Sequence, residues 1–220
     1  PLAVALSAAS KPLFVIGGGA AKAGADLAAV LETCGAACFE TYAGRGVVPW
    51  DYPLNFGPAL ARPSSAQIVA QADCVVAIGT ELAEVDLWRA HLGHSCPLYR
   101  IDIDPECLAD MQRAEMGILA RAEEAMASLR PLMAASASQW QARSVAHQRG
   151  LWRAETEAER PGIIAIVEAL RAVVPDDAMI YSDMTQFAYV ANEVWPMTRA
   201  KHWHHPSGFG TLGYALPAAI

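Results

Sequence analysis

Residues 12–20 read PLFVIGGGA, and residues 74–79 and 98–103 read CVVAIG and LYRIDI. Each apolar run has the length and the composition of a buried strand, and the first one enters three consecutive glycines. Residues 20–31 follow with helix-forming composition, and a second helix-forming stretch covers residues 64–72. Strands that alternate with helices predict a parallel sheet covered on both faces, so the predicted fold class is α/β.

Three units are predicted along the chain. The alternating strands and helices, which include a further strand over residues 37–42, assign residues 1–137 to a Rossmann-like central domain. Residues 138–160 are polar, with two tryptophans as the main apolar side chains, and are interpreted as a helical connector. Residues 161–220 are expected to begin a second α/β unit, with a helix, a strand over residues 179–182 and another helix.

The composition narrows the class of protein. The chain has 220 residues, 54% hydrophobic and 18% charged, which is typical of a compact globular protein. A net charge of −7 removes the attraction on which general nucleic-acid binding depends, so no nucleic-acid partner is expected. With no run of roughly 18 apolar residues and no recognisable leader, we expect a cytoplasmic protein without a membrane partner. The chain stops at Ile220 inside an apolar run, which suggests a piece of a longer protein.

The glycine turn at residues 17–19 is a candidate nucleotide site, because glycines let the backbone approach a pyrophosphate. The GxGxxG spacing fails at Lys22, although Glu40 stands near the distance typical of a ribose ligand. A tight turn without a ligand is the favoured interpretation. Asp104 is likewise interpreted as the cap of a helix that begins at Pro105, rather than as a ligand.

The end of the chain carries further candidate functional residues. Residues 207–220 read SGFGTLGYALPAAI, and glycines at this density expose the backbone to a ligand at the start of a helix. We expect His204 or His205, together with Phe209, to face a substrate pocket. A metal held by His202 and His204 is disfavoured, because two ligands make a weak site, and the five cysteines lack zinc-site or disulfide spacing.

SGFGTLGYALPAAI resembles the glycine-rich segment of the thiamine-diphosphate-dependent family of acetolactate synthases and 2-oxo acid decarboxylases. Residues 183–186, Asp-Met-Thr-Gln, are similar to that family's Asp-Val-Gly-Gln turn, and PLFVIGGGA, CVVAIGT and YRIDIDPE are similar to strands of its central domain. The resemblance implies a fragment that holds the central domain and the truncated start of the diphosphate-binding domain. The Mg²⁺ ligands are then expected beyond Ile220, where the family's Gly-Asp-Gly motif would follow.

The resemblance also implies roles for individual residues. The cofactor-binding residues that it implies are Thr185, Gln186, Gly210, Thr211 and Leu212. Thr185 and Gln186 would lie near the diphosphate, and the backbone carbonyl of Gly210 would contact the exocyclic amine of the cofactor. The side chain of Leu212 would hold the two cofactor rings in a V, which brings the amine close to the thiazolium carbon. No catalytic residue and no metal ligand is expected within the chain itself.

The implied function is the decarboxylation or carboligation of a small-molecule 2-oxo acid through an enamine intermediate. It belongs to the full-length protein, expected to be a homodimer or homotetramer, whereas the fragment alone is expected to be inactive. FAD is not expected, because residues 81–84 read ELAE where FAD-binding synthases carry Arg-Phe-Asp-Asp. The alternative is a non-catalytic nucleotide-binding Rossmann module, which accounts for residues 12–110 but not for the glycine-rich segment.

Overall fold

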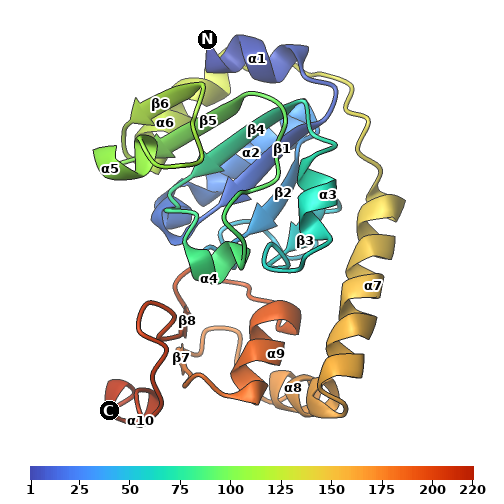
Figure 1. The fold of residues 1–220 in the computed structure, drawn as a ribbon, viewed down its shortest axis with the longest axis vertical. Helices are drawn as coiled ribbons and strands as arrows, with labels where there is room; N and C mark the ends of the chain where they lie inside the picture. The colour runs from blue at the N-terminus through green and yellow to red at the C-terminus, as the bar shows by residue number, and fades with distance from the viewer.

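The computed structural model describes residues 1–220 (Figure 1). Its strands are β1 (Pro12–Ile16), β2 (Ala37–Glu40), β3 (Asn55–Gly57), β4 (Cys74–Ile78), β5 (Leu98–Asp102), β6 (Met116–Leu119), β7 (Ile180–Tyr181) and β8 (Trp203–His204). Its α-helices are α1 (Leu2–Ala8), α2 (Gly24–Cys34), α3 (Ser65–Val69), α4 (Glu84–Leu87), α5 (Pro105–Leu108), α6 (Ala122–Leu129), α7 (Ala142–Glu159), α8 (Ile163–Arg171), α9 (Gln186–Val194) and α10 (Ala215–Ala218). Two short 3₁₀-helices are η1 (Gly18–Ala23) and η2 (Arg130–Leu132).

The first six strands form one sheet in the order β3-β2-β1-β4-β5-β6, and every neighbouring pair is parallel. The predicted α/β fold with a parallel sheet is therefore confirmed. β1 and β4 lie side by side at the centre, with Val15 opposite Ala77. The strand order reverses at this pair, so the carboxyl ends of β1 and β4 border the crevice where open α/β sheets bind ligands.

Alternate residues of the central strands fill two separate cores. Phe14 and Ile16 of β1 share a core with α1, α2 and α6, whereas Leu13 and Val15 share the other with α3, α4 and α7. All four side chains are completely buried. Because helices cover both faces of the sheet, its central strands are continuous apolar runs rather than alternating ones.

The glycines of the turn after β1 allow it to pack closely against the end of β4. A Cβ atom on Gly17 would lie 2.1 Å from the carbonyl oxygen of Gly79, and one on Gly19 would lie 2.8 Å from the Gly79 Cα atom. The turn is pressed against the end of β4, in agreement with the interpretation of a tight turn. It continues as η1 rather than as the α-helix expected from Ala20, because the backbone N–H of Ala20 donates to Gly17 only three residues back.

The sheet contains two strands that the sequence patterns do not predict. β3 has three residues and lies at one edge of the sheet, and β6 lies at the other edge, with half-buried residues that alternate with exposed ones. β2 ends at Glu40, two residues earlier than the expected strand over residues 37–42. Asp104 caps α5 as predicted, because its carboxylate accepts a hydrogen bond from the backbone N–H of Glu106 at 2.9 Å.

The predicted connector is the 18-residue helix α7, which runs along one side of the molecule and leads into α8 (Figure 1). Trp152 on this helix packs against Phe39 and Phe56, and Trp140 just before it packs against Phe56, with ring centroids 5.8 to 6.0 Å apart. The two tryptophans therefore anchor the connector on the sheet, as the sequence indicates. The unit boundaries after residues 137 and 160 stay predictions.

The second unit consists of α8, α9, α10 and a two-stranded parallel sheet of β7 and β8, and it lies below the carboxyl ends of the central strands in Figure 1. Its core contains seven buried residues, among them Val167, Val190, Trp195 and Trp203. The helix expected after Gly213 is only the four-residue α10. None of the helices in the structure combines the length and the hydropathy that a membrane span requires.

Candidate functional site

The structure brings together the two segments that the sequence singles out near the end of the chain. They are the turn at residues 182–186, called here the Asp183 turn, and the first part of the glycine-rich segment, residues 207–215. The Asp183 carboxylate accepts a hydrogen bond from the backbone N–H of Ala215 at 2.7 Å. The backbone N–H of Met184 donates to the carbonyl of Thr211 at 3.4 Å. Residues about thirty positions apart thus form one continuous surface.

Asp183 is the group that fixes this junction electrostatically. The backbone N–H of Ala215 holds the pKa of its carboxyl below the ordinary value, and the backbone N–H groups of Gly213 and Tyr214 act in the same direction. The carboxylate is therefore ionised near neutral pH and is already engaged with the backbone that follows the glycines. Its role within this chain is to hold the glycine-rich segment in place.

Thr185 and Gln186 stand at the N-terminus of α9. The Thr185 hydroxyl oxygen caps the helix by accepting from the backbone N–H of Ala188 at 3.3 Å, which leaves its hydroxyl proton free to donate elsewhere. Both side chains are exposed. A helix N-terminus carries a partial positive charge, and together with a hydroxyl and an amide it forms a donor set suited to phosphate oxygens.

The glycine-rich segment presents its backbone and two large apolar side chains to the exterior. Gly210 and Gly213 have φ angles of +70° and +82°, a region that favours glycine. Leu212 is 68% exposed and Phe209 is 92% exposed, and neither lines one of the five main cavities of the chain. The substrate pocket expected around Phe209 is therefore not formed by these 220 residues. Apolar side chains this exposed beside a donor-rich turn are available to a ligand or to another part of the protein.

His205 lies in a short chain of hydrogen-bonded polar side chains. Its Nδ1 atom is 2.9 Å from the hydroxyl of Ser182, which also accepts from the indole N–H of Trp203 at 2.9 Å. Burial lowers the pKa of His205 to about 4, and the positive charge of Arg45 adds to this effect. The imidazole is therefore neutral near pH 7, which suits it to hold β8 and the Asp183 turn together.

The other two histidines of this segment have separate partners. His204 stacks on Tyr181 with ring centroids 4.8 Å apart, and its Nε2 atom is buried without a hydrogen-bond partner. His202 contacts the carbonyl of Ala178 through Nδ1 at 3.3 Å. No group of three or more His, Cys, Asp or Glu side chains in the structure is placed to hold a metal ion, and all five cysteines are free thiols.

In the structure, Glu40 is not available as the ribose ligand that a nucleotide site at the first glycine turn would need. Glu40 is completely buried and accepts hydrogen bonds from the side chain of Asn55 and the backbone of Gly46, both at 3.2 Å. Its carboxylate therefore organises the loop after β2 and cannot reach a ribose. A cavity of about 220 Å³ does lie at the carboxyl ends of the central strands, with Gly19, Asp102 and other residues in its wall.

Two arginines near the site are missed by the sequence patterns. Arg45 and Arg62 lie in loops of the central domain, yet each contacts α9 through its guanidinium group. Neither belongs to a motif with a known spacing. The signal that remains is chemical: each stands in a largely apolar, proline- and glycine-rich loop, where an arginine needs a partner from elsewhere in the fold.

Comparisons with known proteins give a consistent result. The sequence profile of the family described as "Thiamine pyrophosphate enzyme, central domain" matches residues 1–129. A probable 2-ketoarginine decarboxylase from Pseudomonas aeruginosa is 39% identical over 98% of this chain and 39% of its own length. The large subunit of acetolactate synthase isozyme 1 from Escherichia coli is 27% identical over 99% of this chain and 40% of its own.

Other similarities point the same way. Pyruvate oxidase from Lactiplantibacillus plantarum is 29% identical over 98% of this chain and 37% of its own length. An X-ray structure from Mycobacterium smegmatis, described as a thiamin diphosphate-dependent enzyme, superposes with a TM-score of 0.73 at 22% identity. It covers 99% of this chain and 42% of the solved one, and the likeness concerns the fold. This chain thus spans about two fifths of the length of the relatives that it matches.

Proposed function

The chain belongs to the thiamine pyrophosphate enzyme family, and on that premise we propose that the whole protein uses thiamine diphosphate to decarboxylate a 2-oxo acid. The 39% identical relative, a probable 2-ketoarginine decarboxylase, supports decarboxylation, and the acetolactate synthases leave carboligation as the second outcome of the same chemistry. The nucleotide-binding module without catalysis is not favoured, because the relatives are enzymes that match along the entire chain.

The observation that carries the proposal is the contact between the Asp183 turn and the glycine-rich segment. Through Asp183 and Met184 the two segments form one surface, with a helix N-terminus on one side and an exposed glycine backbone on the other. Such a surface offers N–H donors for an anion and a carbonyl for an amine within one site. These are the two kinds of group that thiamine diphosphate presents at its opposite ends.

The residues present fit half of a cofactor site. When bound, thiamine diphosphate supplies a nucleophilic carbon and an electron sink for the decarboxylation of 2-oxo acids. Thr185 and Gln186, with the first N–H groups of α9, would hold the diphosphate, since their donors are exposed and unshared. The backbone around Gly210 and Thr211 would bind the aminopyrimidine. The exposed side chain of Leu212 would contact the cofactor and hold its two rings in a V.

The remaining parts of the proposal concern the rest of the protein. We expect the Mg²⁺ ligands beyond Ile220, a homodimer or homotetramer of the full-length chain, and a cytoplasmic location. Catalysis without FAD remains a further expectation. The substrate pocket is expected to be completed over His205 and Phe209 by residues outside this chain, because Phe209 is 92% exposed and neither residue lines one of the five main cavities.

The test uses the full-length protein, purified without cofactor. Titration with thiamine diphosphate in the presence of Mg²⁺, followed by tryptophan fluorescence, should give saturable binding. Addition of a panel of 2-oxo acids, including 2-oxo-5-guanidinopentanoate and pyruvate, should then release CO₂ only when the cofactor is present. Binding of a nucleotide with no cofactor-dependent CO₂ release from any of these acids would contradict the proposal.

A further inference from the structure

Two arginines of the central domain reach across to the second unit. Arg45 lies in the loop after β2 and Arg62 in the loop after β3, and both are buried, with 2% and 6% of their surface exposed. The Arg45 guanidinium donates to the side-chain oxygen of Asn192 at 2.8 Å and to the carbonyl of Ala191 at 3.3 Å. Both acceptors are in the second half of α9.

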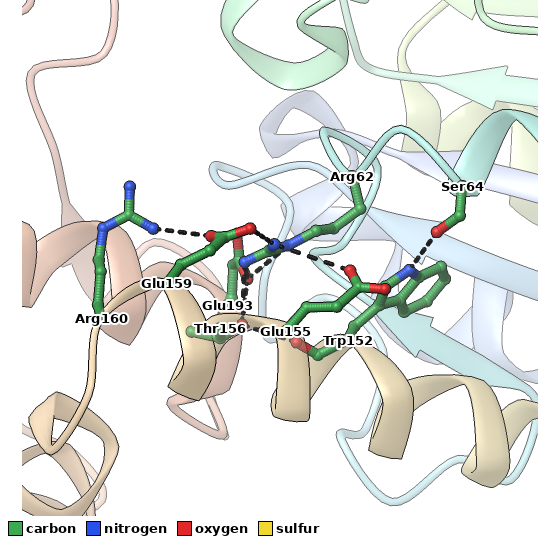
Figure 2. Close-up of polar contacts among 8 residues, drawn as sticks. All are labelled: Arg62, Ser64, Trp152, Glu155, Thr156, Glu159, Arg160 and Glu193. Carbon is green, nitrogen blue, oxygen red and sulfur yellow. Dashed lines mark hydrogen bonds and ion pairs between the residues drawn. The ribbon is translucent and has the colours of Figure 1, made fainter.

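Figure 2 shows Arg62 between α7 and α9. Its Nη2 atom is 2.7 Å from a carboxylate oxygen of Glu193 on α9, and its Nη1 atom is 2.6 Å from a carboxylate oxygen of Glu159 on α7. The hydroxyl of Thr156 on α7 completes the group, at 3.0 Å from Arg62 and 2.9 Å from Glu193. One guanidinium therefore joins the central domain, the connector and the second unit.

The contacts of the two arginines are linked to the candidate cofactor site through α9 and β8. α9 has nine residues, so its N-terminal cap Thr185 lies about 13 Å from the end that the arginines hold. The Arg45 guanidinium also lies over the ring of Trp203, 4.7 Å from its centroid. Trp203 is in β8, which leads into the glycine-rich segment. Each of the two parts of the site is thus attached to the central domain through a buried guanidinium.

We propose that Arg45 and Arg62 are positioning residues that set the place of the Asp183 turn and the glycine-rich segment relative to the central domain. The proposal rests on the proposed function, since the site they position is the thiamine diphosphate site. A buried guanidinium with several fixed acceptors permits one docking geometry, because any other arrangement leaves a charge without partners. The preformed half-site then needs less ordering when the cofactor binds.

The variants are chosen so that loss of stability and loss of positioning separate. Arg62→Lys keeps the charge but cannot reach Glu193 and Glu159 with a planar fork. Glu193→Gln keeps the shape of the side chain and one acceptor oxygen, and it is the second variant if Arg62→Lys folds poorly. The matched control is Arg100→Lys, because Arg100 is as deeply buried and bonds Asp110 at 2.6 Å, but both of these residues lie in the central domain.

Three quantities are measured on the full-length protein: the melting temperature, the dissociation constant for thiamine diphosphate with Mg²⁺, and amide hydrogen exchange without cofactor. We expect both arginine variants to melt earlier. Only Arg62→Lys and Glu193→Gln should weaken cofactor binding, by about tenfold, and speed exchange over residues 183–190 and 205–214. At saturating cofactor their kcat should return close to that of the unmodified protein, because bound cofactor restores the order of the site.

The outcomes separate the two proposals. If the unmodified protein binds the cofactor and Arg62→Lys binds it equally well with unchanged exchange, the positioning role is wrong. If Arg100→Lys has the same effects on binding and exchange, they come from lost stability and the positioning role is also wrong. If the unmodified protein binds no thiamine diphosphate, the proposed function is contradicted, while hydrogen exchange still tests whether Arg62 orders α9.

Discussion

At the scale of single residues, Leu212 combines high exposure with a central place in the candidate site. Leu212→Ala should lower kcat of the full-length enzyme by about tenfold or more, because the cofactor loses the surface that holds it bent. The melting temperature should hardly change, since the side chain packs into no core. Leu212→Met should be mild because its volume is nearly conserved. Normal turnover by the alanine variant would remove Leu212 from the site.

Glu40 makes the stability of the chain depend on pH. Burial raises the pKa of this carboxyl from about 4.5 to about 7. The folded chain therefore binds the proton more tightly than the unfolded chain, and the free energy of unfolding falls as the pH rises from about 4.5 to about 7. Glu40→Gln should reduce this fall by on the order of 3 kcal/mol. Urea unfolding of the unmodified protein and of Glu40→Gln at pH 5 and pH 8 measures the change in the free energy of unfolding. An equal change in the two proteins would contradict the prediction.

The residues that the sequence did not reveal have partners far away along the chain. Arg45 bonds a side chain 147 positions later, and Arg62 bonds one 131 positions later. Local patterns carry no information about such pairs, because the two halves of each contact are chosen by tertiary packing. By contrast, the Asp104 cap was predicted together with its helix, since a cap and its helix lie within three residues of each other.

At the scale of elements, the strands most easily predicted are those buried on both faces. β1 and β4 are continuous apolar runs and β5 is apolar apart from Arg100 and Asp102, whereas β3 has three residues, β8 has two and β6 alternates at an edge. Such short or half-exposed strands form because a neighbouring strand offers its edge, which the local sequence does not record. The 3₁₀ form of η1 likewise follows from the close packing of the glycine turn on β4 rather than from helix propensity.

Two glycines in different elements give a paired prediction. Gly17→Ala should lower the free energy of unfolding by about 3 kcal/mol, because its Cβ atom would overlap the backbone of Gly79 and force β1 and β4 apart. Gly150→Ala should raise it by about 1 kcal/mol, because this glycine lies inside α7 with open space around it. Chemical unfolding of both variants checks the pair, and equal effects would show that close packing does not explain the glycine turn.

At the scale of the whole molecule, the two units differ in the size of their hydrophobic cores. The central sheet has two cores of 23 and 18 buried residues, while the second unit has one of seven. We expect residues 1–160 to fold alone with a cooperative thermal transition, and residues 161–220 to remain largely unfolded alone. Circular dichroism of the two fragments tests this. A cooperative transition in the shorter one would mean that it does not need the contacts made by Arg45 and Arg62.

The connector α7 has a consequence for how the length of this protein can vary. Loops between domains commonly accept inserted residues. Here, however, the ring of Trp152 packs on Phe39 and Phe56 of the sheet. Thr156 and Glu159, further along the same helix, must face Arg62. One residue inserted after Arg153 would rotate the following side chains by about 100° around the helix axis. The Glu159 carboxylate and the Thr156 hydroxyl would then point away from the Arg62 guanidinium. In this stretch the number of residues matters more than their identity, so deletions and insertions should be tolerated less well than substitutions.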